Sequence, residues 1–316
     1  MTLVLSLVTG PMALHVSDRL LSRGGSPWDP LANKSVIVLG SDGHACISYS
    51  GLAYLGSMPT DQWIAEVISN RDLGMRVGRE AGSAVRIESR FVPRVGFVFT
   101  RLAEAIADRF RNLPADHRAQ GLRVLVAGFL IRQPSSTRAR ARPFMIRYAY
   151  DRHAGGRVTR TELPRYWDWA RSLKLGSVGV DPGTAKDHLL ATLASPAEGG
   201  KRDQDDCERL LVDCIRTVSG KQRAGMNTVG RDCMSAVLSR EGHIRVRFLP
   251  DPLNDPGLSA YTPWIVAPGV VWPPSVLSGG LPEIVAGGYR VVFDRLPALT
   301  PSSQLNTSSQ PRRRFP

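Results

Sequence analysis

Three residues near the start of the chain have the types and the spacing needed for nucleophilic hydrolysis. Thr2 follows the initial methionine, and Asp18 and Lys34 follow it at two equal intervals of 16 residues. Removal of Met1, which is efficient before a small residue, would leave a free α-amino group and a hydroxyl on Thr2. Such a residue carries both a nucleophile and its own base. Lys34 would favour the alkoxide-like form of the hydroxyl, and Asp18 would keep the lysine charged.

A β-hairpin is expected to bring the first two of these residues together. Residues 2–8 and 13–21 are strand-like, and Thr9-Gly10-Pro11 between them is a turn signal. In a hairpin centred on this turn, the numbers of paired residues sum to about 20. The pattern therefore predicts that Thr2 and Asp18 are paired.

The remaining patterns predict strands, two helices, strands, two helices and strands, in that order. The expected strands are 2–8, 13–21, 35–39, 45–50, 122–132, 144–150, 232–239 and 243–249, and the expected helices are 61–69, 98–113, 185–193 and 204–218. This order indicates an α+β fold in which two antiparallel sheets pack face to face with helix pairs outside, a four-layer αββα sandwich.

Composition divides the chain into three parts. Residues 1–250 hold the predicted elements and form the expected domain. Residues 251–300 are rich in proline and glycine and are expected to be an extension. Residues 301–316 are rich in serine, contain the run Arg312-Arg313-Arg314, and are expected to be a disordered tail.

Five short pieces of the sequence resemble, in order, the proteasome β-subunit branch of the N-terminal nucleophile (Ntn) hydrolases, a family that includes bacterial proteasome-type proteases. The resemblance covers about residues 2–249. The matching pieces are Thr2 at the nucleophile position, Ser17-Asp18-Arg19 at the family's Asp-bearing strand, Asn33-Lys34 at its lysine, Ser50-Gly51-Leu52-Ala53 at the turn before the first helix, and Arg231-Asp232-Cys233-Met234-Ser235 at its Arg-Asp-x-x-Ser motif.

The resemblance implies further roles around the nucleophile. Asp232 and Ser235 would orient the α-amino group, and Arg19 would pair with Asp232. The backbone N–H of Gly51 would bind the developing oxyanion, a contribution of ~3 kcal/mol in other enzymes. Tyr49 would line the pocket for a substrate side chain.

The sequence also departs from the family pattern. The stretch from Lys34 to Gly51 is longer than in the usual subunits, and Ala236-Val237 stands where the family has two glycines. The family's Gly-Ser-Gly has only a loose counterpart at Gly176-Ser177-Val178-Gly179, so no catalytic role is assigned to Ser177.

Composition restricts the compartment and the cofactors. The 316 residues contain no run of eighteen apolar residues, so no membrane association is expected. The four cysteines form no CxxC pair and suit a reducing cytoplasm; neither a metal nor an organic cofactor is expected. Residues 2–8 resemble the apolar part of a signal peptide but lack a basic start. Secretion would remove Thr2 and exclude the mechanism.

The leading interpretation is a cytoplasmic, homo-oligomeric hydrolase that cleaves peptide or protein substrates at amide bonds through Thr2. One alternative is that the protein has this fold but is a non-catalytic assembly subunit. The other is a nucleic-acid-binding protein, since the net charge is +13 and the loop 133–143 carries Arg138, Arg140 and Arg142. Because interleaved aromatic residues are missing there, no nucleic-acid partner is expected.

Overall fold

The structure is a computed structural model that describes residues 2–23, 26–29, 32–73, 85–86, 93–131, 141–151, 157–162, 173–195, 203–222, 228–251, 261–275, 283–286 and 288–295. Met1, most of the basic loop 133–143 and the tail 301–316 lie outside the described residues. The predictions made for the loop and the tail therefore stay predictions.

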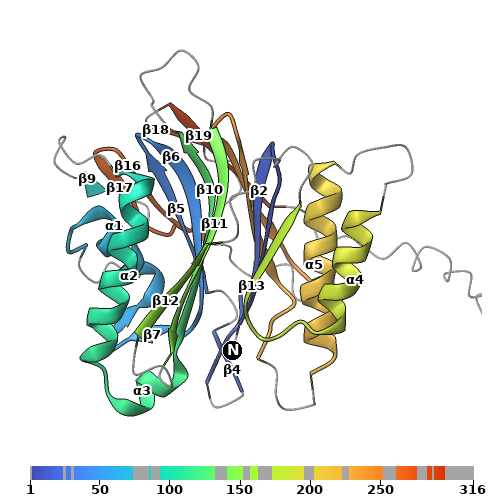
Figure 1. The fold of residues 1–316 in the computed structure, drawn as a ribbon, viewed down its shortest axis with the longest axis horizontal. Helices are drawn as coiled ribbons and strands as arrows, with labels where there is room; N and C mark the ends of the chain where they lie inside the picture. The colour runs from blue at the N-terminus through green and yellow to red at the C-terminus, as the bar shows by residue number, and fades with distance from the viewer. Residues whose placement is uncertain are drawn as a thin grey trace, which may run out of the picture.

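Two large sheets form the centre of the fold (Figure 1). From edge to edge, the seven-stranded sheet contains β13 (Lys174–Gly179), β1 (Leu3–Val8), β2 (Met12–Asp18), β14 (Cys233–Ser239), β15 (His243–Leu249), β19 (Tyr289–Arg295) and β18 (Glu283–Ala286). The eight-stranded sheet contains β12 (Arg157–Glu162), β11 (Ala141–Asp151), β10 (Leu122–Ile131), β6 (Gly43–Gly51), β5 (Ser35–Gly40), β16 (Trp264–Ala267), β17 (Val270–Trp272) and β9 (Val85–Arg86). Two small hairpins pair β3 (Leu21–Arg23) with β4 (Ser26–Asp29) and β7 (Tyr54–Leu55) with β8 (Met58–Pro59).

The helices cover the outer faces of the sheets (Figure 1). The helices α1 (Thr60–Ser69), α2 (Val95–Arg111) and α3 (Ala115–Gln120) lie on the side of the eight-stranded sheet, and α4 (Thr184–Ala194) and α5 (Gln204–Gly220) lie on the side of the seven-stranded sheet. Three apolar cores separate the layers, one between the two sheets and one under each helix pair. The predicted α+β class is confirmed, and the two large sheets are compatible with the predicted sandwich.

Strand alternation distributes the side chains between these cores. In β1, Val4 and Val8 belong to the core between the sheets, whereas Leu3, Leu5 and Leu7 belong to the core under α4 and α5. Successive side chains of a strand point to opposite faces, so a strand between two apolar layers is apolar throughout. All six residues of β1 are buried, and five of them are apolar for this reason; the sixth is Ser6.

A carboxylate in the turn between β5 and β6 caps α2, the longest helix on the outer face of the eight-stranded sheet. Asp42 accepts the N–H groups of Val95 and Gly96 at 2.6 and 3.0 Å. These are two of the N–H groups that a helix leaves without an internal partner at its start. The helix therefore begins at Val95, three residues before the predicted position, and it ends at Arg111, ahead of Pro114.

Both sheets are mixed, so the prediction of two antiparallel sheets is wrong in this respect. β16 pairs parallel with β5, and β19 pairs parallel with β15. These strands come from beyond residue 250, the predicted end of the domain, and they extend both sheets. Their partners are distant in the sequence, and a local hydrophobic pattern does not reveal such pairing.

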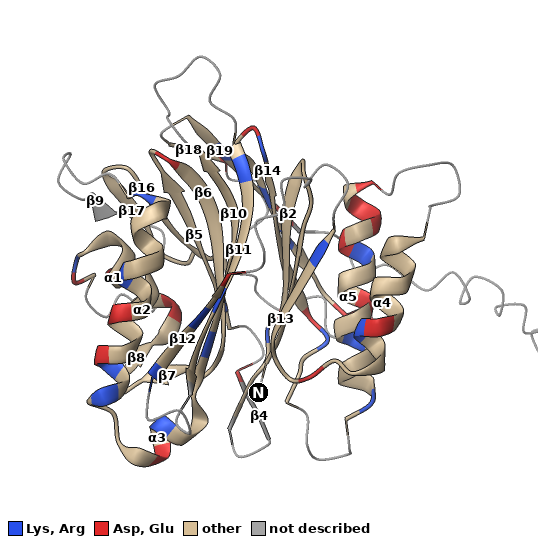
Figure 2. Ribbon diagram, in the orientation of Figure 1, with Lys and Arg blue, Asp and Glu red and all other residues tan. Residues whose placement is uncertain are grey.

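Charged side chains lie mostly on the outside of the molecule. Figure 2 shows Lys, Arg, Asp and Glu on the outer helices and toward the strand ends, while much of the strands between the layers is uncharged. Within the described ranges, no helix combines the length and the apolar character required to cross a bilayer.

Because β19 belongs to the central core, truncating one of its buried side chains should destabilise the whole domain. Phe293 is 1% exposed in the core between the sheets, whereas Val285 on the neighbouring β18 is 69% exposed. We expect Phe293→Ala to lower the free energy of unfolding by about 3–5 kcal/mol. The matched Val285→Ala variant should stay within about 0.5 kcal/mol. Urea denaturation of both variants measures this, and equal midpoints would show that β19 is not part of the core.

Candidate active site

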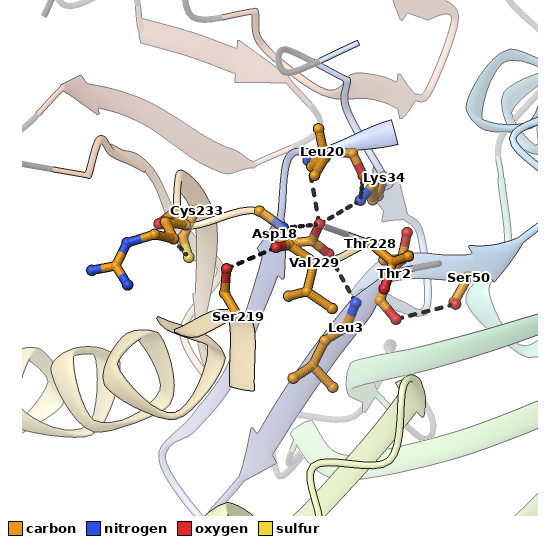
Figure 3. Close-up of polar contacts among 12 residues, drawn as sticks. Thr2, Leu3, Asp18, Leu20, Lys34, Ser50, Ser219, Thr228, Val229 and Cys233 are labelled. Carbon is orange, nitrogen blue, oxygen red and sulfur yellow. Dashed lines mark hydrogen bonds and ion pairs between the residues drawn. The ribbon is translucent and has the colours of Figure 1, made fainter. Parts of the chain in front are cut away.

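The site is built around the carboxylate of Asp18, at the end of β2 (Figure 3). Its Oδ1 accepts the N–H of Leu3 at 2.8 Å. Its Oδ2 accepts Lys34 Nζ at 2.9 Å and the N–H groups of Gly230 and Leu20 at 3.0 and 3.3 Å. Asp18 is fully buried. A buried carboxylate requires such a set of donors, because transfer of a charge out of water is otherwise costly.

The ammonium of Lys34 completes the ion pair and is equally buried. Besides Asp18, it donates to the carbonyl oxygen of Leu20 at 2.5 Å. Both side chains of the ion pair are 0% exposed. Burial lowers the pKa of Lys34, and the negative charge of Asp18 offsets part of this effect. The lysine therefore supplies a positive charge that is held inside the protein next to the start of β1.

The hairpin register differs by one residue from the prediction. Val4 pairs with Ser17, so the paired numbers sum to 21 and Asp18 lies opposite Leu3 rather than Thr2. The reason is the turn, in which the N–H of Thr9 donates to the carbonyl of Met12, so its centre falls after Gly10. The Asp18 carboxylate consequently binds the peptide N–H between Thr2 and Leu3.

Two other strands hold the backbone of Thr2. Its carbonyl oxygen accepts the N–H of Val180 at 2.8 Å and the hydroxyl of Ser50 at 3.5 Å. Gly179 has φ +105°, and a Cβ at this position would lie 1.7 Å from the carbonyl oxygen of Thr2. Only glycine permits this approach. Strand alternation directs the Thr2 side chain toward the eight-stranded sheet, from which Lys34 comes.

Gly51 and Tyr49, the predicted oxyanion and pocket residues, have different surroundings. Gly51 is at the exposed end of β6, directly after Ser50, and has φ +109°. Tyr49 is 3% exposed in the core under α1 and α2, where its hydroxyl donates to the carbonyl of Asn33 at 3.3 Å. Burial raises the pKa of Tyr49 well above its ordinary value. The structure thus corrects the pocket assignment, because alternation along β6 turns Tyr49 toward the helices.

The Arg-Asp-x-x-Ser motif makes contacts on the helix side and around residue 251. Arg231 Nε donates to Asp251 Oδ2 at 2.6 Å, and Asp232 Oδ1 accepts the N–H of Asp251 at 2.6 Å. Ser235 Oγ donates to Glu208 Oε1 of α5. Ser235 therefore lies on the face of β14 that is turned away from the eight-stranded sheet, and the structure does not bring it to Thr2.

Arg19 is also held by packing and by the backbone. Its N–H donates to the carbonyl of Asp232 at 3.0 Å, and its guanidinium carbon lies 5.3 Å from the centre of the Phe248 ring. The predicted site residues therefore fall into two groups. In the first, Asp18 binds Lys34 and the N–H that follows Thr2, and Gly51 directly follows Ser50, which contacts Thr2. In the second, Arg19, Asp232 and Ser235 contact the neighbouring strands, segment 251 and α5.

A buried polar chain between the sheets was not recognised in the sequence. His15 Nδ1 lies 2.7 Å from Ser6 Oγ and 3.4 Å from Ser48 Oγ, and Ser48 Oγ lies 2.8 Å from Ser35 Oγ. Burial lowers the pKa of His15 to about 4, so the imidazole is neutral near pH 7. Ser6 pairs directly with His15 in the observed register, and only that register would have revealed the contact.

Comparison with known proteins adds no family assignment. The chain matches no protein-family model, and no curated protein matches it.

Breaking the buried ion pair should cost much more than removing an exposed one. We expect Asp18→Leu and Lys34→Met each to lower the free energy of unfolding by about 3–5 kcal/mol, because each leaves one buried charge without its partner. The double variant should lose clearly less than the sum, since neither charge remains. Asp108→Asn, which removes an exposed pair with Arg111, is the control and should change stability by less than about 1 kcal/mol. Additive single effects in denaturation would contradict this account.

A second histidine, His44 on β6, should make stability depend on pH. Burial lowers its pKa to about 4, so between about pH 6.5 and pH 4 the unfolded chain binds a proton that the folded chain does not. Stability should fall as the pH falls through this range, by up to about 3 kcal/mol for this group. Burial raises the pKa of Asp61 to about 7, which acts in the opposite direction over the same range.

The contribution of this histidine is isolated by comparing the native chain with His44→Gln, because Asp61 titrates equally in both. The variant should lose less stability between pH 7 and pH 4.5 in urea denaturation. Parallel curves for the two proteins over that range would show that the buried imidazole does not titrate as argued.

Proposed function

We propose that this protein is a threonine-nucleophile hydrolase of peptide or amide bonds, with the Ntn-type αββα fold of proteasome β-subunits. The observation that carries the proposal is the dual contact of one carboxylate. Asp18 accepts both the ammonium of Lys34 and the N–H that follows Thr2. The Lys34 cation and the hydroxyl-bearing Thr2, at the start of β1, are thereby held next to the same buried carboxylate.

In the proposed reaction, processing first removes whatever precedes Thr2 and frees its α-amino group. This amine takes the proton of Thr2 Oγ1 while the oxygen attacks the substrate carbonyl carbon. The oxyanion that forms accepts the backbone N–H of Gly51. Collapse breaks the C–N bond, and the proton passes to the leaving amine. Water then hydrolyses the ester on Thr2, with the α-amino group again as base. Lys34 stabilises negative charge on Oγ1 when this oxygen attacks and when it leaves again.

The proposal also includes the compartment, the substrates and the oligomeric state. The four cysteines, Cys46, Cys207, Cys214 and Cys233, are buried and form no disulfide in the described part of the chain, which suits a reducing cytoplasm. By the resemblance, the substrates are peptides or proteins and the active form is a homo-oligomer.

A specific observation favours the alternative of a non-catalytic assembly subunit. Ser235, which the resemblance assigns to the α-amino group, is bound to Glu208 instead. A β-lactone probe, which acylates an N-terminal threonine, separates the two functions. Labelling of Thr2 in the processed protein supports hydrolysis, and intact unlabelled protein supports the assembly role.

Replacement of the nucleophile should abolish activity without affecting the fold. We expect Thr2→Ala to lower kcat for peptide hydrolysis by about 10³-fold or more. Thr192→Ala, at a half-buried position of α4 on the outside of the seven-stranded sheet, is the matched control and should keep full activity. Mass spectrometry should find Thr2 as the first residue of the active native protein. Hydrolysis that survives in Thr2→Ala, or active protein with a blocked N-terminus, refutes the mechanism.

A further inference from the structure

A cavity of about 320 Å³ lies at the end of β13, against the segment that binds the Thr2 backbone. One wall is the segment 177–181, at the end of β13, and the opposite wall contains Arg123 of β10 and Arg147 of β11. Gly179 and Val180 of the first wall both contact the Thr2 carbonyl. The cavity and the proposed nucleophile therefore share a wall.

The two arginines face the same space from neighbouring strands. Arg123 pairs with Ala149 and Leu125 pairs with Arg147, so the arginines are diagonal neighbours on one face of the sheet. Leu125, which shares this face with Arg123, belongs to the core between the sheets. The arginines continue that inner face to the open end of the sandwich, where both are exposed.

Among the described residues, most N–H donors of these two guanidinium groups have no hydrogen-bond acceptor. Arg123 Nη1 donates to the carbonyl of Gly179 at 3.3 Å, which fixes the guanidinium against the β13 wall. A guanidinium has five N–H donors, so further donors remain. Over the described part of the chain, neither Arg123 nor Arg147 forms an ion pair with a carboxylate.

One acidic residue, Asp181, also lines the cavity. Its Oδ1 accepts the N–H of Gly183 at 3.0 Å, in the turn before α4. This bond holds the carboxylate in its own turn, and the cavity keeps an excess of positive charge from the two arginines.

We propose that this cavity binds a carboxylate of the substrate, so that the enzyme prefers acidic peptides. The inference rests on the proposed function for its catalytic consequence. Two guanidinium groups match a carboxylate in charge and can bind it with paired hydrogen bonds. A volume of about 320 Å³ is at the lower end for ligand sites and suits one side chain or one chain terminus.

Binding to small probes tests the cavity without requiring hydrolysis. N-acetyl-glutamate α-amide carries a side-chain carboxylate, N-acetyl-glutamine carries a terminal carboxylate, and N-acetyl-glutamine amide carries neither. In NMR titrations at low salt, we expect one of the two acids to bind at least about tenfold more tightly than the neutral amide. The tighter acid identifies the source of the carboxylate. Equal affinity of all three probes overturns the inference.

Variants connect this binding to Arg147. Arg147→Ala should lose the preference for the acid, and Arg147→Glu should reverse it toward a probe with a lysine side chain. Arg111→Ala, at an exposed position at the end of α2, should keep it. Persistence of the preference in Arg147→Glu overturns the assignment.

Hydrolysis assays distinguish failure of the inference from failure of the proposed function. Peptide pairs that differ only by Glu and Gln, at each of two positions on either side of the cleaved bond, should give a kcat/KM ratio of about tenfold that Arg147→Ala abolishes. Hydrolysis with equal kcat/KM for each pair keeps the function and overturns the inference. If the protein cleaves no peptide but still binds the acid in a way that depends on Arg147, the carboxylate site is supported and the hydrolase function is rejected.

Discussion

The burial of a single carboxylate organises the end of the sandwich where β1 begins. Asp18 collects four donors from β1, from its own strand end, from Lys34 and from the segment before β14. A charge that is fully buried must be compensated in this way, or the domain loses several kcal/mol. The position of the Thr2–Leu3 peptide is therefore fixed by a requirement of stability. The proposed chemistry uses a geometry that folding already demands.

Strand alternation is the second constraint, and it decides which residues meet between the sheets. The Thr2 side chain, Ser50, Arg123 and Arg147 belong to inner faces, whereas Tyr49 and Ser235 belong to outer faces. A shift of one position along a strand exchanges these groups. This is why Ser50, and not Tyr49, contacts Thr2.

Local sequence patterns were sufficient for the elements but not for their long-range pairing. All twelve predicted helices and strands are present, with ends that differ by a few residues. The parallel strands β16 and β19 were missed because their partners lie far away in the sequence. In the site, spacing predicted the pair of Asp18 and Lys34, while the pocket role of Tyr49 failed because it depends on which face of β6 points inward. The cavity of Arg123 and Arg147 requires three strands in contact, and no local motif encodes it.

A single peptide unit at the end of β13 links the proposed nucleophile to the proposed specificity site. Gly179 contacts Thr2 so closely that any side chain there would overlap the carbonyl oxygen of Thr2, and its own carbonyl accepts Arg123. The arginine that would bind a substrate carboxylate is thereby held by the residue that positions the nucleophile. Displacement of this strand end would disturb both contacts at once, although Asp18 and Ser50 also hold the Thr2–Leu3 peptide. In the proposed enzyme, the same short segment contributes to binding a carboxylate and to aligning Thr2, and the close approach to Thr2 is what requires the glycine.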